Sequence, residues 1–233
     1  MIPRIIHQIY EDPAGPPDML LSLAATWKEH HPGWEYRFWD RLSIDTFLTL
    51  HFPDYIARYR SFPYDVQRWD AIRYLILYRL GGLYADMDYE CLDPLDSLLN
   101  GHSCCMGLEP SEHAPQFNLT YIIGNALMAT VPSHPYFEMI IQDIFIRQTI
   151  PLSGSKSFHV INTTGPLMTT RVYDACPQKD EIKLLAPELV APLSIEEVGA
   201  FIEGRETPEM EEKAKKAFAV HYFFGSWYPQ LNR

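Results

Sequence analysis

The sequence predicts an α/β fold with a mostly parallel central sheet. Short apolar runs of strand length alternate along the chain with longer segments that have helical spacing. The clearest helical segment ends at two glycines, and a further strand-like run follows at once. No repeat, low-complexity tract or linker interrupts this order, so we expect residues 1–233 to form a single domain.

The first sixty residues predict two strands and two helical segments. The apolar run IIHQIY has the length of a buried strand, and WEYRFWD alternates with Trp34, Tyr36 and Phe38 on one face. The expected order is strand 5–10, loop 11–18, helix 19–32, strand 34–40 and a helical segment 43–60 that is interrupted at Pro53.

The next helix is predicted over residues 61–82. Pro63 and Asp65 stand near its start, and Gly81-Gly82 favours a left-handed stop. Most of its sides are apolar, but Gln67, Asp70, Arg73 and Tyr74 follow at steps of three and four and share one polar face. An Asp–Arg pair on an otherwise buried helix usually has a purpose beyond stability.

The rest of the chain continues the alternation. Residues 83–90 predict a strand, and a helix opens at Ser133 with His134-Pro135 in its first turn. We expect strands over 102–108 and 119–130, a helix over 133–149, and loop and strand over 150–163. A helix over 163–176 should follow a Gly-Pro turn. After it we expect short strands with acidic loops, a helical segment over 211–218 and the terminal motif HYFFGSW over 221–227.

Composition excludes several classes of function. The net charge of -11 argues against a broad nucleic-acid surface, which needs clustered Lys and Arg. The four cysteines form no C-x-x-C pair, which favours reduced thiols and a cytoplasmic location. No secretory leader or window of 18 apolar residues is recognised, so we expect no membrane span, although peripheral contact with the inner face of a membrane is compatible with this chain.

Two acids one residue apart, in GGLYADMDYE, form the main candidate site. In a continuous strand, Tyr84, Asp86 and Asp88 would share one face, with the carboxylates about 6–7 Å apart. A divalent cation such as Mg²⁺ or Mn²⁺ would offset their repulsion and hold phosphate oxygens.

Other interpretations of the pair stay open. The spacing fits the two acids of an inverting glycoside hydrolase, and a solvated acidic turn needs no function at all. A calcium-binding EF-hand loop is excluded, because Cys91 stands where the loop requires glycine.

Longer motifs point to one family. The run QRWDAIRYLILYRLGGLYADMDYECLDPL resembles the signature of the DXD-containing sugar transferases of glycosyltransferase family 32, and the catalytic domain of clostridial glucosylating toxins. The family includes outer-chain mannosyltransferases, glycolipid α-galactosyltransferases and bacterial capsule enzymes. Further matching segments, in the family's order, are IPRIIHQIY, HPGWEYRFWD, NALMATVPSHP, TTGP and HYFFGSW.

The resemblance implies a GT-A fold, a Rossmann-like αβα sandwich, and a role for particular residues. Asp88 would bind the metal directly, Asp86 would touch metal, ribose or sugar, and His221 would be the third protein ligand. Ser226 and Trp227 would close over the diphosphate. The remaining donor contacts implied are Asp70 and Arg73 to sugar hydroxyls, Tyr84 to ribose or sugar, His7, Gln8, Ile9 and Tyr10 to the base, and Asn125 to the sugar or to a turn.

The implied activity is transfer of a hexose, with retention and with Mn²⁺ or Mg²⁺, to a hydroxyl of a glycan or lipid, forming an α-linkage. We expect UDP-galactose or UDP-glucose as donor, with GDP-mannose as the alternative and a non-catalytic, metal-dependent carbohydrate-binding protein as a further one. Front-face attack is favoured, and Asp70 and Glu109 are the carboxylates to test as a nucleophile.

Overall fold

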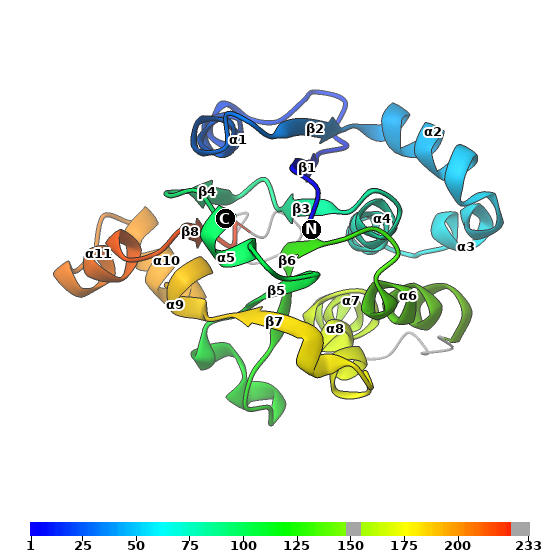
Figure 1. Cartoon of the computed structure of the whole chain (residues 1–233). Coiled ribbons are helices and arrows are strands. Elements are labelled where there is room, and N and C mark those ends of the chain that lie inside the picture. Colours follow the sequence, from blue (N-terminus) through cyan, green and yellow to red (C-terminus); the bar gives the residue numbers. More distant parts are fainter. Residues whose placement is uncertain (148–154, 225–233) are drawn as a thin grey trace.

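A central β-sheet runs through the molecule in the computed structural model, which describes residues 1–147 and 155–224 (Figure 1). In these residues six strands pair in the order β2-β1-β3-β6-β5-β7. Only β6 runs against the others, so the predicted mostly parallel sheet is confirmed. The strands are β1 (Ile5–Ile9), β2 (Glu35–Trp39), β3 (Gly82–Ala85), β5 (Cys104–Leu108), β6 (Ile123–Thr130) and β7 (Ile182–Leu185).

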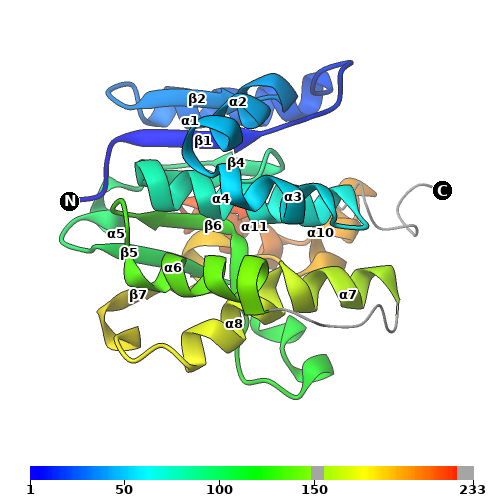
Figure 2. The same ribbon diagram turned by 90° about the vertical axis from the view of Figure 1, so that its right-hand side faces the viewer.

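Helices cover both faces of this sheet (Figures 1 and 2). One face packs against α2 (Arg41–His51), α3 (Ile56–Arg60), α4 (Asp65–Leu80), α6 (Pro135–Gln142), α7 (Lys156–Thr163) and α8 (Pro166–Asp174). The opposite face of the sheet packs against α1 (Asp18–His30), α5 (Asp96–Leu99), α9 (Pro187–Val190) and a small antiparallel sheet of β4 (Tyr89–Cys91) and β8 (Ala219–His221). The result is an αβα sandwich.

The alternation of side chains along the strands produces two separate cores. On β5, Cys104 enters the core beneath α4 and α6, whereas Cys105 enters the core beneath α9. On β3, Tyr84 and Leu83 separate in the same way. The four cysteines are free thiols and buried.

Helix α4 lies at the centre of the larger core. Ten of its sixteen residues are buried, including the polar face that begins at Gln67. The helix ends at Gly81, whose φ of 65° places it in the left-handed region, as predicted from the Gly-Gly pair. Gly82 has a φ of 102°, and a Cβ there would stand 2.6 Å from the carbonyl oxygen of Ile5. Glycine therefore allows β3 to lie directly against β1.

Several predicted elements differ from the structure. Residues 156–163 form helix α7 where we expected loop and strand, because Ser155 caps the helix by accepting from the N–H of Phe158. The helix expected at 133–149 starts after the cap His134 and continues as a π-helical turn, η4 (Asp143–Arg147). Before β8 the chain forms helix α10 (Ile195–Ile202), where we expected short strands and acidic loops. It then forms helix α11 (Pro208–Lys215), which overlaps the helical segment expected over 211–218.

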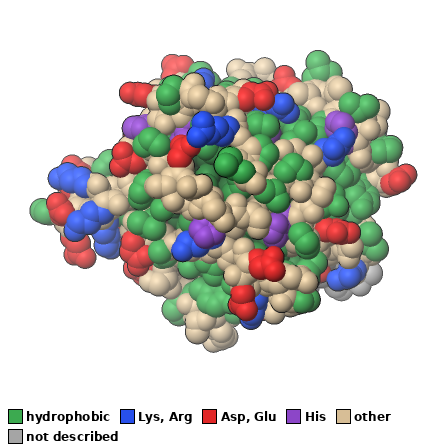
Figure 3. Space-filling view, in the orientation of Figure 1, with side chains coloured by type: hydrophobic (Ala, Val, Ile, Leu, Met, Phe, Trp, Pro, Cys, Tyr) green, Lys and Arg blue, Asp and Glu red, His purple; other side chains and the backbone are tan. Residues whose placement is uncertain are grey.

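The end of the molecule formed by α10 and α11 has charged side chains of both signs (Figure 3). Lys213 pairs with Glu197 at 2.5 Å, and Lys215 pairs with Glu211. Basic groups at this end are thus offset locally by acids. In the part of the chain that the structure describes, no helix has both the length and the apolar character needed to cross a bilayer.

Candidate metal and donor site

The two acids of the Asp-x-Asp motif lie in a turn between two sheets. Strand β3 ends at Ala85 and β4 begins at Tyr89, so Asp86 and Asp88 are not in the continuous strand that we expected. The chain leaves the main sheet here and enters the small one. The N–H of Asp86 still donates to the carbonyl of Ala126 on β6 (2.9 Å), which fixes the start of the turn.

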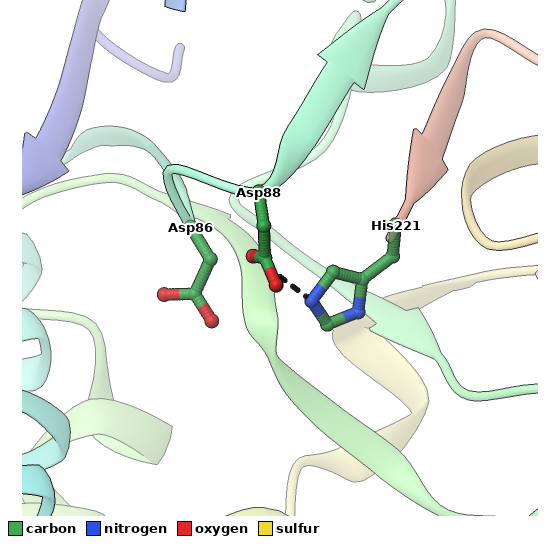
Figure 4. A group of neighbouring side chains, drawn as sticks. All are labelled: Asp86, Asp88 and His221. Carbon is green, nitrogen blue, oxygen red and sulfur yellow. Dashed lines mark ion pairs between the residues drawn. The ribbon is translucent and has the colours of Figure 1, made fainter. Parts of the chain in front are cut away.

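A residue from the far end of the chain completes the cluster. In the small sheet Tyr89 stands opposite His221, which brings the imidazole beside the turn (Figure 4). His221 Nε2 lies 3.2 Å from Asp88 Oδ1, and ligand atoms of Asp86, Asp88 and His221 all lie within 4.8 Å of one another. The structure thus brings together the three side chains that the sequence suggested as metal ligands.

The backbone beyond β8 also holds Asp88. The N–H of Tyr222 donates to the carbonyl of Asp88, and the N–H of Phe224 donates to its carboxylate Oδ2, both at 2.9 Å. Each carboxylate oxygen of Asp88 therefore has a partner on the segment that carries His221. The acid and the imidazole are oriented by the same piece of backbone.

The imidazole of His221 is held between two aromatic rings. Tyr89 stacks on it with ring centroids 4.4 Å apart and planes 6° from parallel, and Phe223 lies 3.9 Å away on a tilted plane. Phe223 has a φ of 47°, a left-handed conformation that is uncommon for an aromatic residue. We did not predict either ring from the sequence, although Tyr89 directly follows Asp88 and Phe223 stands two residues after His221.

Asp86 is oriented from the other side by α4 and β3. Arg73 Nη1 lies 3.0 Å from Asp86 Oδ1, and the Tyr84 hydroxyl donates to the same oxygen at 2.5 Å. The guanidinium also lies over the ring of Tyr84, 4.7 Å from its centroid. Arg73 and Tyr84 thus form one support for the first acid of the motif.

The same guanidinium binds Asp70 one helical turn earlier. Arg73 Nη2 lies 3.2 Å from Asp70 Oδ1, and both side chains are less than 10% exposed, so the predicted pair is buried. The Asn125 amide donates to Asp70 Oδ1 (2.9 Å) and the Thr164 hydroxyl donates to Oδ2 (2.8 Å). The polar face of α4 therefore connects to β6 and to the threonines before α8.

Burial and charge set the protonation of this network. Burial raises the pKa of Asp70 to about 6, although Arg73, Thr164 and Asn125 favour its ionised form. Burial also raises the pKa of Asp86, and the neighbouring charge of Asp88 adds to this effect. Two acids with raised pKa values beside one arginine are typical of a functional site.

Asp88 and His221 shift in opposite directions. Burial alone would raise the pKa of Asp88, but the charge and hydrogen bond of His221 outweigh burial and lower it. Burial alone would lower the pKa of His221, but Asp88 outweighs it and raises that pKa. The two groups form an ion pair in the absence of a metal, and a cation would replace the imidazolium proton.

Strand β1 lies beside β3 and supports the site, and our expectation that His7 contacts a nucleotide base needs correction. His7 is fully buried: its Nε2 donates to the carbonyl of Gly81 (2.9 Å), and its Nδ1 accepts from Trp39 Nε1 (3.1 Å). Burial lowers the pKa of His7 to about 4. Its imidazole is therefore a neutral structural group that has no free nitrogen to offer a nucleotide base.

Gln8 is also fully buried. Its amide donates to the carbonyl of Asp86 (3.2 Å) and its Oε1 accepts from the Tyr36 hydroxyl (2.8 Å). Ile9 is buried in the larger core, whereas Tyr10 is partly exposed at the end of the strand. Among the four residues expected to line the base pocket, only the Tyr10 side chain has substantial access to solvent. Ser226 and Trp227 lie outside the described residues.

The cluster has the chemistry of a divalent-cation site. Two carboxylates and one neutral imidazole suit Mn²⁺ well and Mg²⁺ through its oxygen ligands. The side chains of Asp86, Asp88 and His221 are 25%, 17% and 12% exposed, so they are enclosed yet reachable. Two negative charges enclosed in this way are expensive unless a cation or proton balances them.

Known proteins with related sequences were compared with this chain. The family model described as a glycosyltransferase sugar-binding region containing a DXD motif matches residues 17–104. Inositol phosphoceramide mannosyltransferase 2 of Schizosaccharomyces pombe is 33% identical over 179 residues, which cover 75% of this chain and 47% of the relative. Mannosyl phosphorylinositol ceramide synthase CSH1 of Saccharomyces cerevisiae is 32% identical over 178 residues, or 74% of this chain and 43% of the relative.

These matches confirm the resemblance inferred from the motifs. The chain spans about half the length of the two curated relatives. Among solved structures, the PaToxG glycosyltransferase superposes with a TM-score of 0.52 and 15% identity, covering 92% of this chain and 84% of that one. Such a likeness bears on the fold alone, and it confirms the predicted GT-A architecture.

Proposed function

We propose that this chain, which belongs to the DXD-containing sugar transferases of glycosyltransferase family 32, is a metal-dependent hexosyltransferase that uses a nucleotide-sugar donor. The observation that supports this best is the cluster of Asp86, Asp88 and His221, with Arg73 and Asp70 directly behind it. A bound Mn²⁺ or Mg²⁺ supplies positive charge against the departing diphosphate.

The protein's own residues orient the donor in this proposal. Arg73 and Tyr84 fix the Asp86 carboxylate, while the backbone of Tyr222 and Phe224 fixes Asp88. A site held this rigidly loses little free energy in reorganisation when charge develops on the leaving group. In this proposal the sugar lies on the side of Asp70, whose carboxylate is held by Asn125 on β6 and by Thr164 before α8.

The surroundings of Asp70 favour front-face attack with retention. Its carboxylate is 6% exposed and is already bound by Arg73, Asn125 and Thr164, so it is poorly placed to act as a nucleophile. In the proposed step the acceptor oxygen bonds to the anomeric carbon while the bond from that carbon to the phosphate oxygen breaks. The hydroxyl proton passes to the departing phosphate oxygen, so atoms and charge balance.

We infer a mannosyl donor, GDP-mannose, ahead of the UDP-galactose or UDP-glucose expected from the sequence. The support is that both curated relatives are named for mannosyl transfer. Their names also mention an inositol phosphoceramide acceptor, and we infer a lipid headgroup or glycan hydroxyl as the acceptor here. Transfer from UDP-galactose or UDP-glucose stays a prediction that the same assay tests.

A panel of nucleotide sugars tests this proposal. The protein is incubated with GDP-mannose, UDP-galactose or UDP-glucose, each with Mn²⁺ or with EDTA, and its melting temperature and the release of free nucleotide are measured. We expect one donor to raise the melting temperature and to be hydrolysed slowly, in Mn²⁺ only. If no donor does either, the transferase proposal is wrong. Stabilisation by free sugars without hydrolysis of any donor would favour the carbohydrate-binding alternative.

A further inference from the structure

A third carboxylate, that of Glu109, lies near the cluster of Asp86, Asp88 and His221, and the donor site proposed above does not use it. Glu109 directly follows β5, and Asp86 directly follows β3. Both strands are antiparallel to β6, which lies between them, so they end at the same edge of the sheet. Glu109 packs against Gly124, where a Cβ would stand 3.4 Å from its Cγ, and the next residue is the donor-site Asn125.

The orientation of Glu109 is fixed by a histidine. His113 Nδ1 lies 3.0 Å from Glu109 Oε2, and His113 Nε2 accepts from the backbone N–H of Ile195 at 3.2 Å. Because Nε2 accepts, the proton must be on Nδ1, which donates it to the carboxylate. His113 is only 6% exposed, so this arrangement is built into the fold at the start of α10.

The second oxygen of that carboxylate is free to bind something else. Among residues 1–147 and 155–224, no donor forms a hydrogen bond with Glu109 Oε1, and the side chain is 22% exposed. A carboxylate with one oxygen held and one oxygen free is suited to accept hydrogen bonds from a hydroxyl-bearing ligand.

An aromatic ring connects this carboxylate to the metal cluster. Phe223 lies edge-on to His113, with centroids 5.3 Å apart, and its ring also contacts His221 at 3.9 Å. The negative charge of Glu109 acts on both His221 and Tyr89, so it lies within electrostatic range of the cluster. Phe223 is partly exposed and can pack against the C–H face of a ring.

We propose that Glu109 and Phe223 form the acceptor subsite, and that the acceptor is a ring with neighbouring hydroxyl groups, a sugar or a cyclitol. Glu109 Oε1 accepts from hydroxyls of the ring, Phe223 packs on its apolar face, and His113 positions Glu109. This inference rests on the proposed transferase function. It places the acceptor beside Glu109 and Phe223, and the donor sugar beside Asp70 and Arg73.

The test compares ring acceptors with a simple alcohol, using the donor identified by the panel above. Wild-type protein is assayed with methyl α-D-mannopyranoside, myo-inositol and 1-propanol, and transfer and donor hydrolysis are measured together. We expect transfer to at least one ring and little transfer to propanol. Transfer to propanol equal to that to the rings, or donor hydrolysis without transfer to either ring, would overturn the assignment of the acceptor class.

The variant Glu109→Gln then tests the residue. Loss of a charged hydrogen bond should raise the KM for the ring acceptor and lower the ratio of transfer to hydrolysis, each by roughly tenfold to a hundredfold. Exposed Glu112→Gln, three residues along, is the matched control and should change neither. An unchanged ratio in Glu109→Gln overturns the proposal, as does a rise in the KM for the donor alone.

A smaller substitution covers the case in which Glu109→Gln does not fold. Glu109→Asp retains the charge but shortens the side chain by one methylene, so a smaller rise in the KM for the acceptor is expected. If Glu109→Asp leaves that KM unchanged, the proposal is wrong. Wild-type protein that neither binds nor hydrolyses any nucleotide sugar would instead contradict the transferase function itself.

Discussion

Arg73 Nη1 lies 3.0 Å from the Asp86 carboxylate, which joins the middle of helix α4 to the turn that carries the Asp-x-Asp motif. The guanidinium also binds Asp70 and the carbonyl of Asn125 on β6, so a single cation balances the buried Asp70 and the partly exposed Asp86. Its pKa is raised because Asp86, Tyr84 and Asp70 outweigh the opposing effect of burial. The position of Asp86 thus depends on Arg73.

Replacing Arg73 with methionine should lower the free energy of unfolding by roughly 3–5 kcal/mol, because the buried carboxylate of Asp70 and the partly exposed one of Asp86 lose their shared cation. Urea unfolding followed by circular dichroism measures the change. The control is Arg205→Met, which breaks an exposed pair with Glu203 and should cost less than about 1 kcal/mol. Equal losses in the two variants would show that the network around Asp86 has no special weight.

Asp88→Asn should abolish transfer, with at least a roughly hundredfold loss in kcat/KM, and should remove the Mn²⁺ dependence of nucleotide binding. The neutral asparagine amide cannot offset the charge of a cation. It also places an N–H group where the Asp88 carboxylate accepts a hydrogen bond from His221 or Phe224. Isothermal titration with the nucleoside diphosphate, with and without Mn²⁺, measures the second effect. Asp93→Asn, an exposed site five residues along, is the control. Normal turnover in Asp88→Asn would refute the metal site.

The stability of the fold should depend on pH through Asp70. Burial, above all, raises the pKa of this residue from 3.8 to about 6 in the folded protein. The folded state therefore binds the proton more tightly than the unfolded state. Any contribution that Asp70 makes is fully present below about pH 4 and is lost as the pH rises through about 6.

Asp70→Asn cannot ionise, so it lacks this pH dependence. The free energy of unfolding of the variant minus that of the wild type should rise by about 3 kcal/mol between about pH 4 and about pH 8. The absolute offset is expected to be unfavourable, because the amide can accept from only one of Asn125 and Thr164. Urea titrations across this range measure the difference, and a constant value would rule out a raised pKa.

Gly82→Ala should destabilise the fold by more than about 2 kcal/mol. The added Cβ combines a φ of 102° with a contact of 2.6 Å to the carbonyl of Ile5. Gly15→Ala is the matched control, because Gly15 also has a positive φ (79°) but no atom lies within 4 Å of its Cβ position. About 1 kcal/mol is expected there. Similar losses at both positions would mean that backbone strain alone, and not the contact between β1 and β3, explains the need for glycine.

Sequence patterns predicted the elements of the first half well, because those elements have clear periods and stops. Helix α4, for example, combines an apolar pattern with the terminal Gly81-Gly82, and both features act locally. The later part was harder. Helix α10 was missed although Ser194 and Glu197 form a capping box, since eight residues leave little room for a periodic pattern to emerge.

Local patterns alone could not place the site, because its geometry depends on pairing between distant segments. The prediction that His221 joins the two acids came from family resemblance, and the pairing of β4 with β8 provides its physical basis. The expectation that His7 and Gln8 contact a base failed for a related reason. Their partners Gly81, Trp39 and Tyr36 belong to other elements, so nothing within strand β1 shows that both side chains are already engaged.

The contact between Phe224 and Asp88 joins residues 136 positions apart. During synthesis, the ribosome adds Asp86 and Asp88 long before it adds His221. Until then the nascent chain holds two carboxylates without the imidazole and without the strand that orders them. The cluster of Asp86, Asp88 and His221 can form only after β8 has emerged and paired with β4. A product that stops before β8 would consequently have both acids but neither the imidazole nor the strand that orders them.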